Sequence, residues 1–177
     1  MKNKSVSYIV KVGLLSAIAL ILYLLEFPIF PAFPWLMADA SDVPALLGGF
    51  ALGPIAGVLV EFIKNVLHFA VKGMTGGVGE LANFLLGVAY VLPAIWLYRT
   101  RKSRKVAIIG MLIGVVLACV MSIVLNLYVF IPLYFPSMEN VWGYIFAGAV
   151  PMTAIKTVAQ SIIVALVYKP LSGILHK

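Results

Sequence analysis

Long apolar stretches, separated by short polar or proline-rich segments, run along the whole chain. A hydrocarbon core of about 30 Å takes roughly 20 helical residues, so most of these stretches have the length of a membrane span. The pattern predicts six helices, although one long helix broken at Gly53-Pro54 would reduce the count to five. The six predicted helices cover about residues 6–27, 42–53, 54–71, 77–98, 106–130 and 144–168.

The segment between the first two predicted helices begins EFPIFPAFPWLM at Glu26 and is rich in proline and aromatic residues. Proline fixes φ and lacks a backbone donor, so an extended, irregular loop is expected here. Irregular backbone in a membrane protein lies in water or is buried in protein, and the aromatic residues argue against a solvated linker. We therefore expect the loop to fold back over the helices.

The composition is typical of an integral membrane protein. Apolar residues make up 63% of the chain, charged residues 11%, and the mean hydropathy is +1.11, whereas soluble proteins average roughly 25% charged residues. We expect an all-α membrane protein that forms a single domain over residues 1–177, because six helices leave no room for a soluble catalytic domain. The single cysteine, Cys119, excludes an intramolecular disulfide.

Most basic residues fall into three groups along the chain. By the positive-inside rule these groups lie in the cytoplasm, so six helices place both termini there and the proline-rich loop outside. The formal charge of +7 is thereby explained by topology, and no nucleic-acid binding is expected. The groups are Lys2, Lys4 and Lys11 before the first helix, Arg99, Arg101, Lys102, Arg104 and Lys105 between the fourth and fifth, and Lys169 and Lys177 after the sixth.

Polar residues recur every three or four positions along the third predicted helix, so they share one face. Polar groups within a span are costly in lipid and are therefore candidates for function. Glu61 and Lys64 could instead form a structural ion pair, with His68 and Lys72 reaching the outer surface. Neither His68 nor His176 has partners at the spacing of metal ligands, so no metal site is expected. The polar residues of this face are Glu61, Lys64, Asn65, His68 and Lys72.

Three further polar sets lie at a similar outer depth in the later helices. Lys156 is the most costly of these residues, because it lies well inside an apolar helix and needs a carboxylate, carbonyl groups or a ligand. A cavity shared by the three sets beneath the loop is expected; the alternative is that Lys156 pairs only with Glu80 or Glu61. The sets are Glu80 and Asn83, Asn126 and Tyr128, and Thr153, Lys156 and Gln160.

Sequence signatures of catalysis are absent from the chain. It contains no GxSxG, no HExxH and no second histidine within a span, which argues against an intramembrane enzyme. It also lacks a GxxxxGK[ST] phosphate-binding loop, so ATP hydrolysis would have to come from partner proteins. A binding or transport role is therefore favoured.

Four segments carry a resemblance to a known family. They are the proline-aromatic loop, DVPALLGGFALGPIAGVLVEFIKNVLH from Asp42 to His68, NLYVFIPLY, and PMTAIKTVAQSIIVALVYKPLS. Together they resemble the riboflavin-specific substrate-binding subunits of energy-coupling-factor (ECF) vitamin transporters, over nearly the whole chain. The resemblance implies six helices in the plasma membrane, no cofactor, an external pocket formed by the first loop and helices four to six, and assembly with a transmembrane coupling subunit and two cytoplasmic ATPases.

The resemblance also implies that small residues on the first helix contact the coupling subunit. In this chain those residues are Gly13 and Ala17, which form a small-xxx-small pair where the family often has two alanines. Packing of this pair within the protein itself is the alternative.

A flavin suits the polar and apolar residues of the expected pocket. Leu36 and Met37 could cover the apolar end of the ring system, while Asn126 and Lys156 could bind its polar edge. Flavin mononucleotide could also be accepted by a cationic lysine, and another vitamin is the alternative ligand within the same family. The remaining candidate ligand-binding residues are Asp39, Glu80, Asn83, Thr153 and Gln160.

Overall fold

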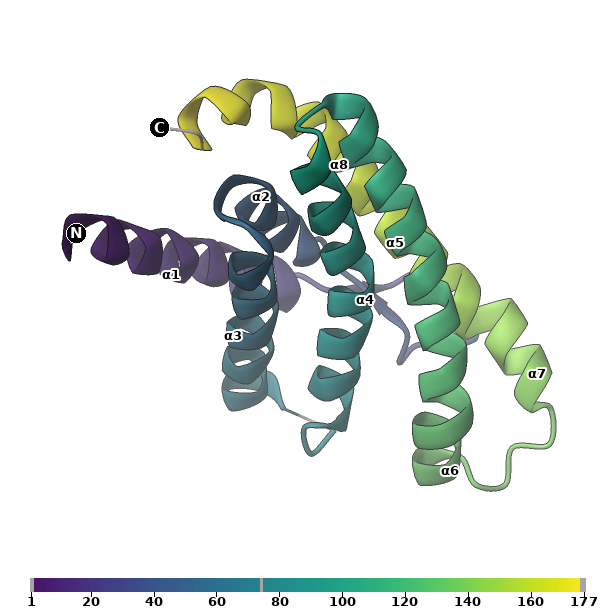
Figure 1. Cartoon of the computed structure of the whole chain (residues 1–177). Helices are drawn as coiled ribbons and strands as arrows, with labels where there is room; N and C mark the ends of the chain where they lie inside the picture. Colours follow the sequence, from purple (N-terminus) through teal and green to yellow (C-terminus); the bar gives the residue numbers. More distant parts are fainter. Residues whose placement is uncertain (1, 74, 176–177) are drawn as a thin grey trace.

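A computed structural model describes residues 2–73 and 75–175 (Figure 1). His176 and Lys177, which entered the predictions of metal binding and topology, lie outside the described residues. Within the described ranges the regular secondary structure is helical apart from one short pair of strands.

Six helical segments follow one another along the described part of the chain. The fifth and sixth segments each contain one π-helical turn. Within each of these two segments the labelled elements follow one another without a break and form one continuous rod (Figure 1). The segments are α1 (Lys2–Leu24), α2 (Asp42–Leu52), α3 (Pro54–Lys72), α4 (Val78–Thr100), α5 (Arg104–Leu125) with η1 (Asn126–Phe130) and α6 (Ile131–Tyr134), and α7 (Val141–Tyr144) with η2 (Ile145–Ala149) and α8 (Val150–Leu175).

Five of these segments are long and apolar enough to cross a membrane. The exception is α2, whose 11 residues span only about 16 Å at the helical rise of about 1.5 Å per residue. The six predicted helices are therefore confirmed as elements, while six membrane crossings stay a prediction. The last rod begins three residues earlier than predicted, at Val141.

The break between α2 and α3 lies at Gly53, whose φ of 105° is unfavourable for residues with a Cβ. Pro54 then starts α3 at a position where its missing N–H leaves no hydrogen bond unmade. The short helix α2 is buried from Asp42 to Phe50 and contacts α1, α3, α4 and α8. It is thus the centre of the bundle rather than a lipid-facing span.

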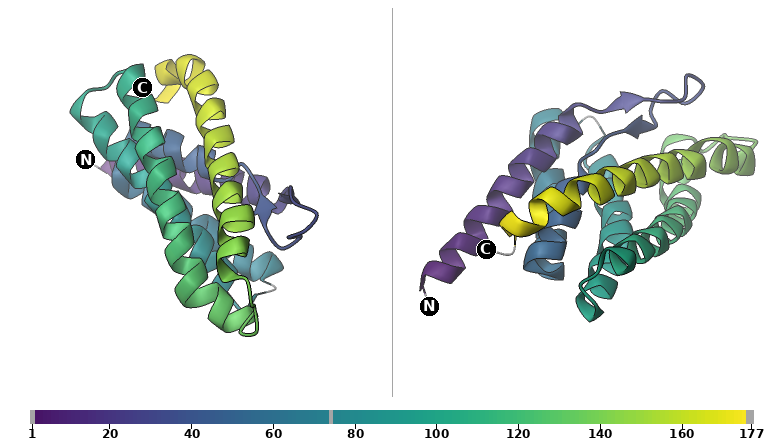
Figure 2. Two further views of the ribbon diagram at one scale, coloured as in Figure 1. Left: turned by 90° about the vertical axis from the view of Figure 1, so that its right-hand side faces the viewer. Right: turned by 90° about the horizontal axis from the view of Figure 1, so that it is seen from above.

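The connection from α1 to α2 is not wholly irregular, because β1 (Phe27–Pro28) pairs antiparallel with β2 (Met37–Ala38). This short hairpin reaches over the start of the last rod (Figure 2). The indole Nε1 of Trp35 donates a hydrogen bond to Tyr144 Oη at 3.2 Å. Phe33 and Leu36 pack against the same part of the chain. The hairpin, which was not predicted, fixes the path by which residues 37–41 return to the bundle.

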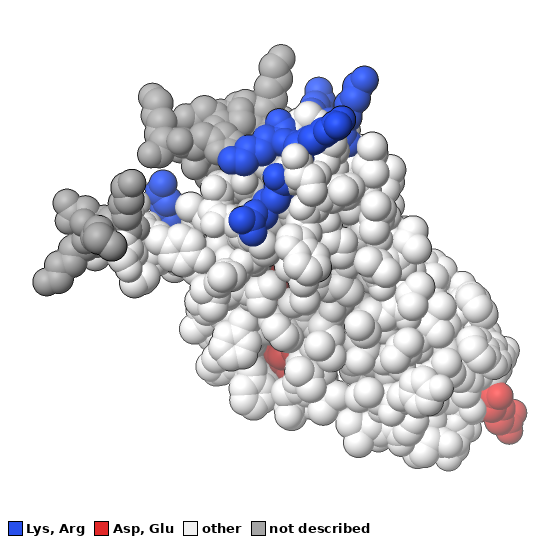
Figure 3. All heavy atoms as spheres, in the orientation of Figure 1, with Lys and Arg blue, Asp and Glu red and all other residues white. Residues whose placement is uncertain are grey.

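Charged side chains are unevenly distributed between the two ends of the molecule. Figure 3 shows lysine and arginine side chains gathered at the end where α4 meets α5, and the acidic side chains visible in this view lie away from it. The basic residues of this connection, from Arg99 to Lys105, are exposed. Such an asymmetry is typical of a membrane protein with one cytoplasmic end.

Candidate ligand-binding site

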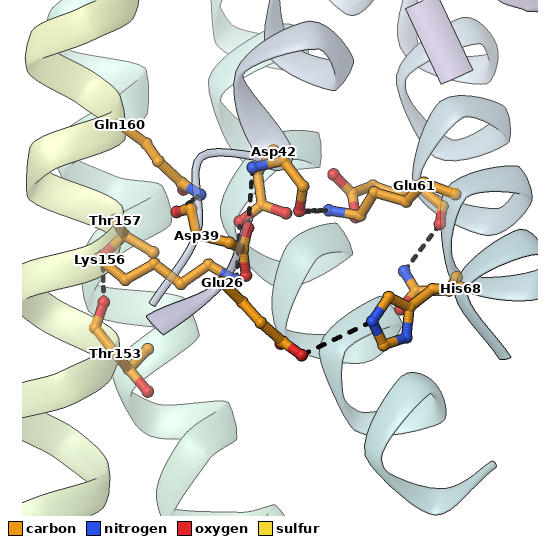
Figure 4. A network of polar contacts seen from close by, with 12 residues as sticks. Glu26, Asp39, Asp42, Glu61, His68, Thr153, Lys156, Thr157 and Gln160 are labelled. Atoms are coloured by element: carbon orange, nitrogen blue, oxygen red, sulfur yellow. Dashed lines mark hydrogen bonds and ion pairs between the residues drawn. The ribbon is translucent and has the colours of Figure 1, made fainter. Parts of the chain in front are cut away.

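One face of α8 carries the polar side chains of the candidate site (Figure 4). Thr153, Lys156 and Gln160 are spaced by three and four residues, so a helix places them on the same side. Thr153 and Gln160 are buried, and the Lys156 side chain is 13% exposed. The polar face of α8 is therefore directed into the protein.

The segment that follows β2 meets this face. Lys156 Nζ lies 2.8 Å from Asp39 Oδ2, and Gln160 Nε2 donates a hydrogen bond to the Asp39 backbone oxygen at 3.1 Å. A second carboxylate oxygen, Asp42 Oδ2, lies 3.7 Å from the same ammonium group. The alternative in which Lys156 pairs only with Glu80 or Glu61 is thus wrong, because its described partners come from residues 39–42.

Asn126 and Thr153 meet at Ser122. The amide of Asn126 donates to the Ser122 backbone oxygen at 2.7 Å, and Thr153 Oγ1 donates to Ser122 Oγ at 3.1 Å. Asn126 is buried and begins the π-helical turn η1. Turns of this kind are frequent at functional sites, since they change the direction in which side chains point.

Glu80 lies on the other side of the bundle, against α3. Its Oε1 is 3.1 Å from His68 Nδ1, and its Oε2 accepts a hydrogen bond from Thr75 Oγ1 at 3.1 Å. Asn83, one turn further along α4, has a buried Oδ1 without a hydrogen-bond partner among the described atoms. No described contact joins Glu80 or Asn83 to Lys156, so their part in one shared site stays a prediction.

Leu36 and Met37 occupy the end of the hairpin that leads to Asp39. Leu36 packs in an apolar cluster with Tyr144 and Ile145, and Met37 is half-buried in β2. Both side chains therefore belong to the loop that covers the start of the last rod, and their role as the apolar cover of a ligand stays a prediction.

The polar face predicted on α3 is confirmed, since its residues from Glu61 to His68 are buried. Lys64 Nζ lies 2.8 Å from Glu61 Oε2, as the expected ion pair requires, and it also contacts the Asp42 carboxylate. Towards the C-terminal end of α3, Lys72 pairs with Glu26 at 2.8 Å, and His68 stacks on the ring of Tyr23 with centroids 3.7 Å apart.

Three residues of this arrangement escaped the sequence analysis as site residues. Asp42 was interpreted only as the start of a helix, and neither Ser41 nor Ser122 was considered. An acidic residue at the end of a proline-rich loop and a serine four positions before Asn126 were the available signals. Neither signal names the partner, which lies on another helix.

The described cavities lie away from Lys156. One is a groove of about 210 Å³ between α3 and α4, with Phe62, Phe84 and Glu80 in its lining. The other, of about 370 Å³, is formed by residues 134–138. Asp39 and Lys156 are in direct contact, so a ligand must join or replace their hydrogen bonds. Among the described residues, no group of three His, Cys, Asp or Glu is placed to hold a metal ion.

The polar side chains described above offer an ammonium group, two amides, a hydroxyl and a carboxylate, and an apolar cluster with aromatic and aliphatic residues lies at the start of the same rod. Such a mixture suits a small ligand with a polar edge and an apolar body. Together with five helices of spanning length, it defines a membrane protein that binds a small solute.

Comparison with known proteins places the chain in a particular family. The family model for the substrate-specific component of ECF transporters matches residues 7–168. The chain belongs to this family. It is therefore a transport component rather than an enzyme, a multi-pass protein of the plasma membrane, and it works with other subunits of an ECF transporter.

Two curated relatives and one solved structure share this similarity. The riboflavin transporter RibU of Staphylococcus aureus (strain TCH60) is 35% identical, over 96% of this chain and 92% of that protein. The riboflavin transporter FmnP of Bacillus subtilis (strain 168) is 34% identical, over 92% and 90%. A structure described as that of the S component of a bacterial ECF transporter is 35% identical, with a TM-score of 0.84 over the full length of both chains.

Proposed function

We propose that this protein binds riboflavin at the outer side of the membrane and supplies it to an ECF transporter for uptake. The observation that carries the proposal is the polar cluster of Lys156, Asp39 and Gln160 beneath an aromatic hairpin. The names of the two curated relatives support the same ligand.

The flavin ring fits the cluster by its chemistry. Its pyrimidine edge has both donors and acceptors, which Asn126 and Lys156 can match, while its dimethylbenzene end is apolar and suits Leu36 and Met37. Hydroxyl groups of the ribityl chain can be bound by four further side chains of the candidate set, which are Asp39, Glu80, Asn83 and Thr153. Flavin mononucleotide is a second ligand in this proposal, since Lys156 is cationic.

Access to the site requires the hairpin to move, because Asp39 and Lys156 are in direct contact. In the proposed cycle the hairpin opens outward, riboflavin takes up contacts with Lys156, and the hairpin closes over the ring. Lys156 keeps a carboxylate nearby during this exchange, since Asp42 Oδ2 is 3.7 Å from its ammonium group. The buried charge of Lys156 is therefore not left without a partner during the exchange.

Transport requires partners that hydrolyse ATP. In the proposed assembly these are one transmembrane coupling subunit and two cytoplasmic ATPases, with both termini of this chain in the cytoplasm. The exposed face of α1 supports a contact with the coupling subunit, because Gly13 and Ala17 lie on it and no other side chain comes within 4 Å of a Cβ built on Gly13. Small residues allow another helix to approach closely.

The absorption spectrum of the detergent-purified protein tests the proposed ligand. We expect the visible bands of an oxidised flavin at near-stoichiometric yield, and their release from the protein on denaturation. Added riboflavin should lose its fluorescence on binding to protein stripped of ligand. A colourless protein that does not quench riboflavin fluorescence would reject riboflavin and direct the search to another vitamin.

A further inference from the structure

A cluster of buried charges connects α3 to the candidate site. Lys64 has no exposed surface, and it reaches across from α3 to the segment that carries Asp39. Its ammonium group donates to Ser41 Oγ at 2.8 Å and contacts the Asp42 carboxylate. Two lysines from opposite sides of the bundle, Lys64 and Lys156, therefore hold the same four-residue segment, 39–42.

Each carboxylate of this segment has a different lysine as its nearest cation. Asp42 directs Oδ1 to Lys64, and its Oδ2 lies 3.7 Å from Lys156. Asp39 is the nearer partner of Lys156, at 2.8 Å. The contact with Lys64 thus holds Asp42 Oδ2 at 3.7 Å from Lys156, which is beyond hydrogen-bond distance.

From this geometry we infer that Lys64 is a positioning residue for the ligand site. Lys64 binds Ser41 and Asp42 and so holds these two residues against α3. Asp39 is then left as the close partner of Lys156 at the place where the ligand is recognised. Without Lys64, Asp42 turns to Lys156 and draws its ammonium group away from Asp39. The inference rests on the proposed function, because it concerns the same site.

The Lys64→Met variant tests this role by riboflavin fluorescence quenching, measured per folded molecule. We expect the dissociation constant to rise at least about tenfold, chiefly through faster dissociation, because one charged contact in the site is misplaced. If this variant does not fold, Lys64→Gln replaces it, since glutamine keeps a hydrogen-bond donor and loses only the charge. The same increase is expected for it.

The double variant Lys64→Met/Asp42→Asn tests the route through Asp42. It removes the competing carboxylate, so Lys156 stays with Asp39 and riboflavin affinity is expected to return to within about threefold of the wild type. Lys72→Met is the matched control. It removes another lysine of α3, which is partly exposed and pairs with Glu26 rather than with residues 39–42, and affinity should not change.

The outcomes separate positioning from a role in folding alone. If Lys64→Met only lowers the unfolding temperature while folded protein binds riboflavin with native affinity, the inference is wrong. It is also wrong if the double variant binds as weakly as the single one. If the wild type itself does not quench riboflavin fluorescence, the proposed function fails instead.

Discussion

Lys156 and Asp39 form an ion pair in which neither side chain has much contact with water, at 13% and 1% exposure. Removing one member of a buried pair leaves the other charge without compensation, which costs about 3–5 kcal/mol. Asp39 has a further neighbour in Ser41, whose backbone N–H donates to its Oδ1 at 2.8 Å, but no second cation is among its described hydrogen-bond or ion-pair partners.

Replacement of Lys156 should therefore affect both stability and binding. For Lys156→Ala we expect the free energy of unfolding to fall by about 3–5 kcal/mol. Riboflavin affinity should fall at least about tenfold, because a charged hydrogen bond is lost. Thermal unfolding in detergent and fluorescence quenching measure the two effects.

The double variant Asp39→Asn/Lys156→Ala separates these effects. It removes both charges, so most of the stability should return, while riboflavin affinity should stay low. Native affinity in the double variant would show that the pair is a structural feature and does not recognise the ligand.

At the scale of elements, α4 and α5 approach each other through two glycines. A Cβ on Gly110 would lie 2.8 Å from Ala94 Cα, and a Cβ on Gly114 would collide with the Tyr90 backbone oxygen. The two glycines are one turn apart on α5 and form the small-xxx-small pattern that brings helix backbones close together. No side chain larger than hydrogen fits at Gly114 without moving one of the helices.

Gly114→Leu is expected to separate α4 from α5 and lower stability by about 1–3 kcal/mol, the usual effect of overpacking. The measurement is the unfolding temperature in detergent. An unchanged temperature would contradict the close contact of the two backbones.

Gly13→Leu is the matched control, because a Cβ at Gly13 meets no atom within 4 Å. We expect it to leave the unfolding temperature and riboflavin binding unchanged. Uptake of riboflavin by cells should nevertheless fall, since Gly13 lies on the face proposed to meet the coupling subunit. If the variant lost riboflavin binding, the separation of ligand site and coupling face would be wrong.

The limits of the elements were largely predictable. Asp42-Val43-Pro44 and Gly53-Pro54 predict a short helix, and α2 covers Asp42–Leu52. Proline and glycine act within a few residues, so their effects can be recognised without the rest of the fold. The β1–β2 pair was not predicted, because each strand has only 2 residues and the pairing depends on where the loop returns.

At the scale of the whole molecule, the basic end defined by the α4–α5 connection predicts the orientation in the membrane. An exposed residue at each end can report it, namely Lys102 in that connection and Ser137 between α6 and α7. The positive-inside rule places Lys102 in the cytoplasm, and a single crossing by α5–α6 then places Ser137 outside.

Cysteine labelling measures this orientation in a variant whose own thiol is removed by Cys119→Ser. A membrane-impermeant maleimide should label Ser137→Cys in intact cells and Lys102→Cys only after permeabilisation. The opposite pattern would reverse the orientation and place the candidate site on the cytoplasmic side.

The sequence by itself determined the membrane character of this protein, its charge asymmetry and the polar faces of α3 and α8, and it predicted six helices with five as the alternative. These properties depend on composition and on the helical repeat, which are local. Only the tertiary structure decided that Lys156 meets Asp39, 117 residues away in the chain, and that Lys64 meets Asp42 on α2. The reason is physical: periodicity shows which face of a helix is polar, but the path of the hairpin and the packing of α2 choose the partner.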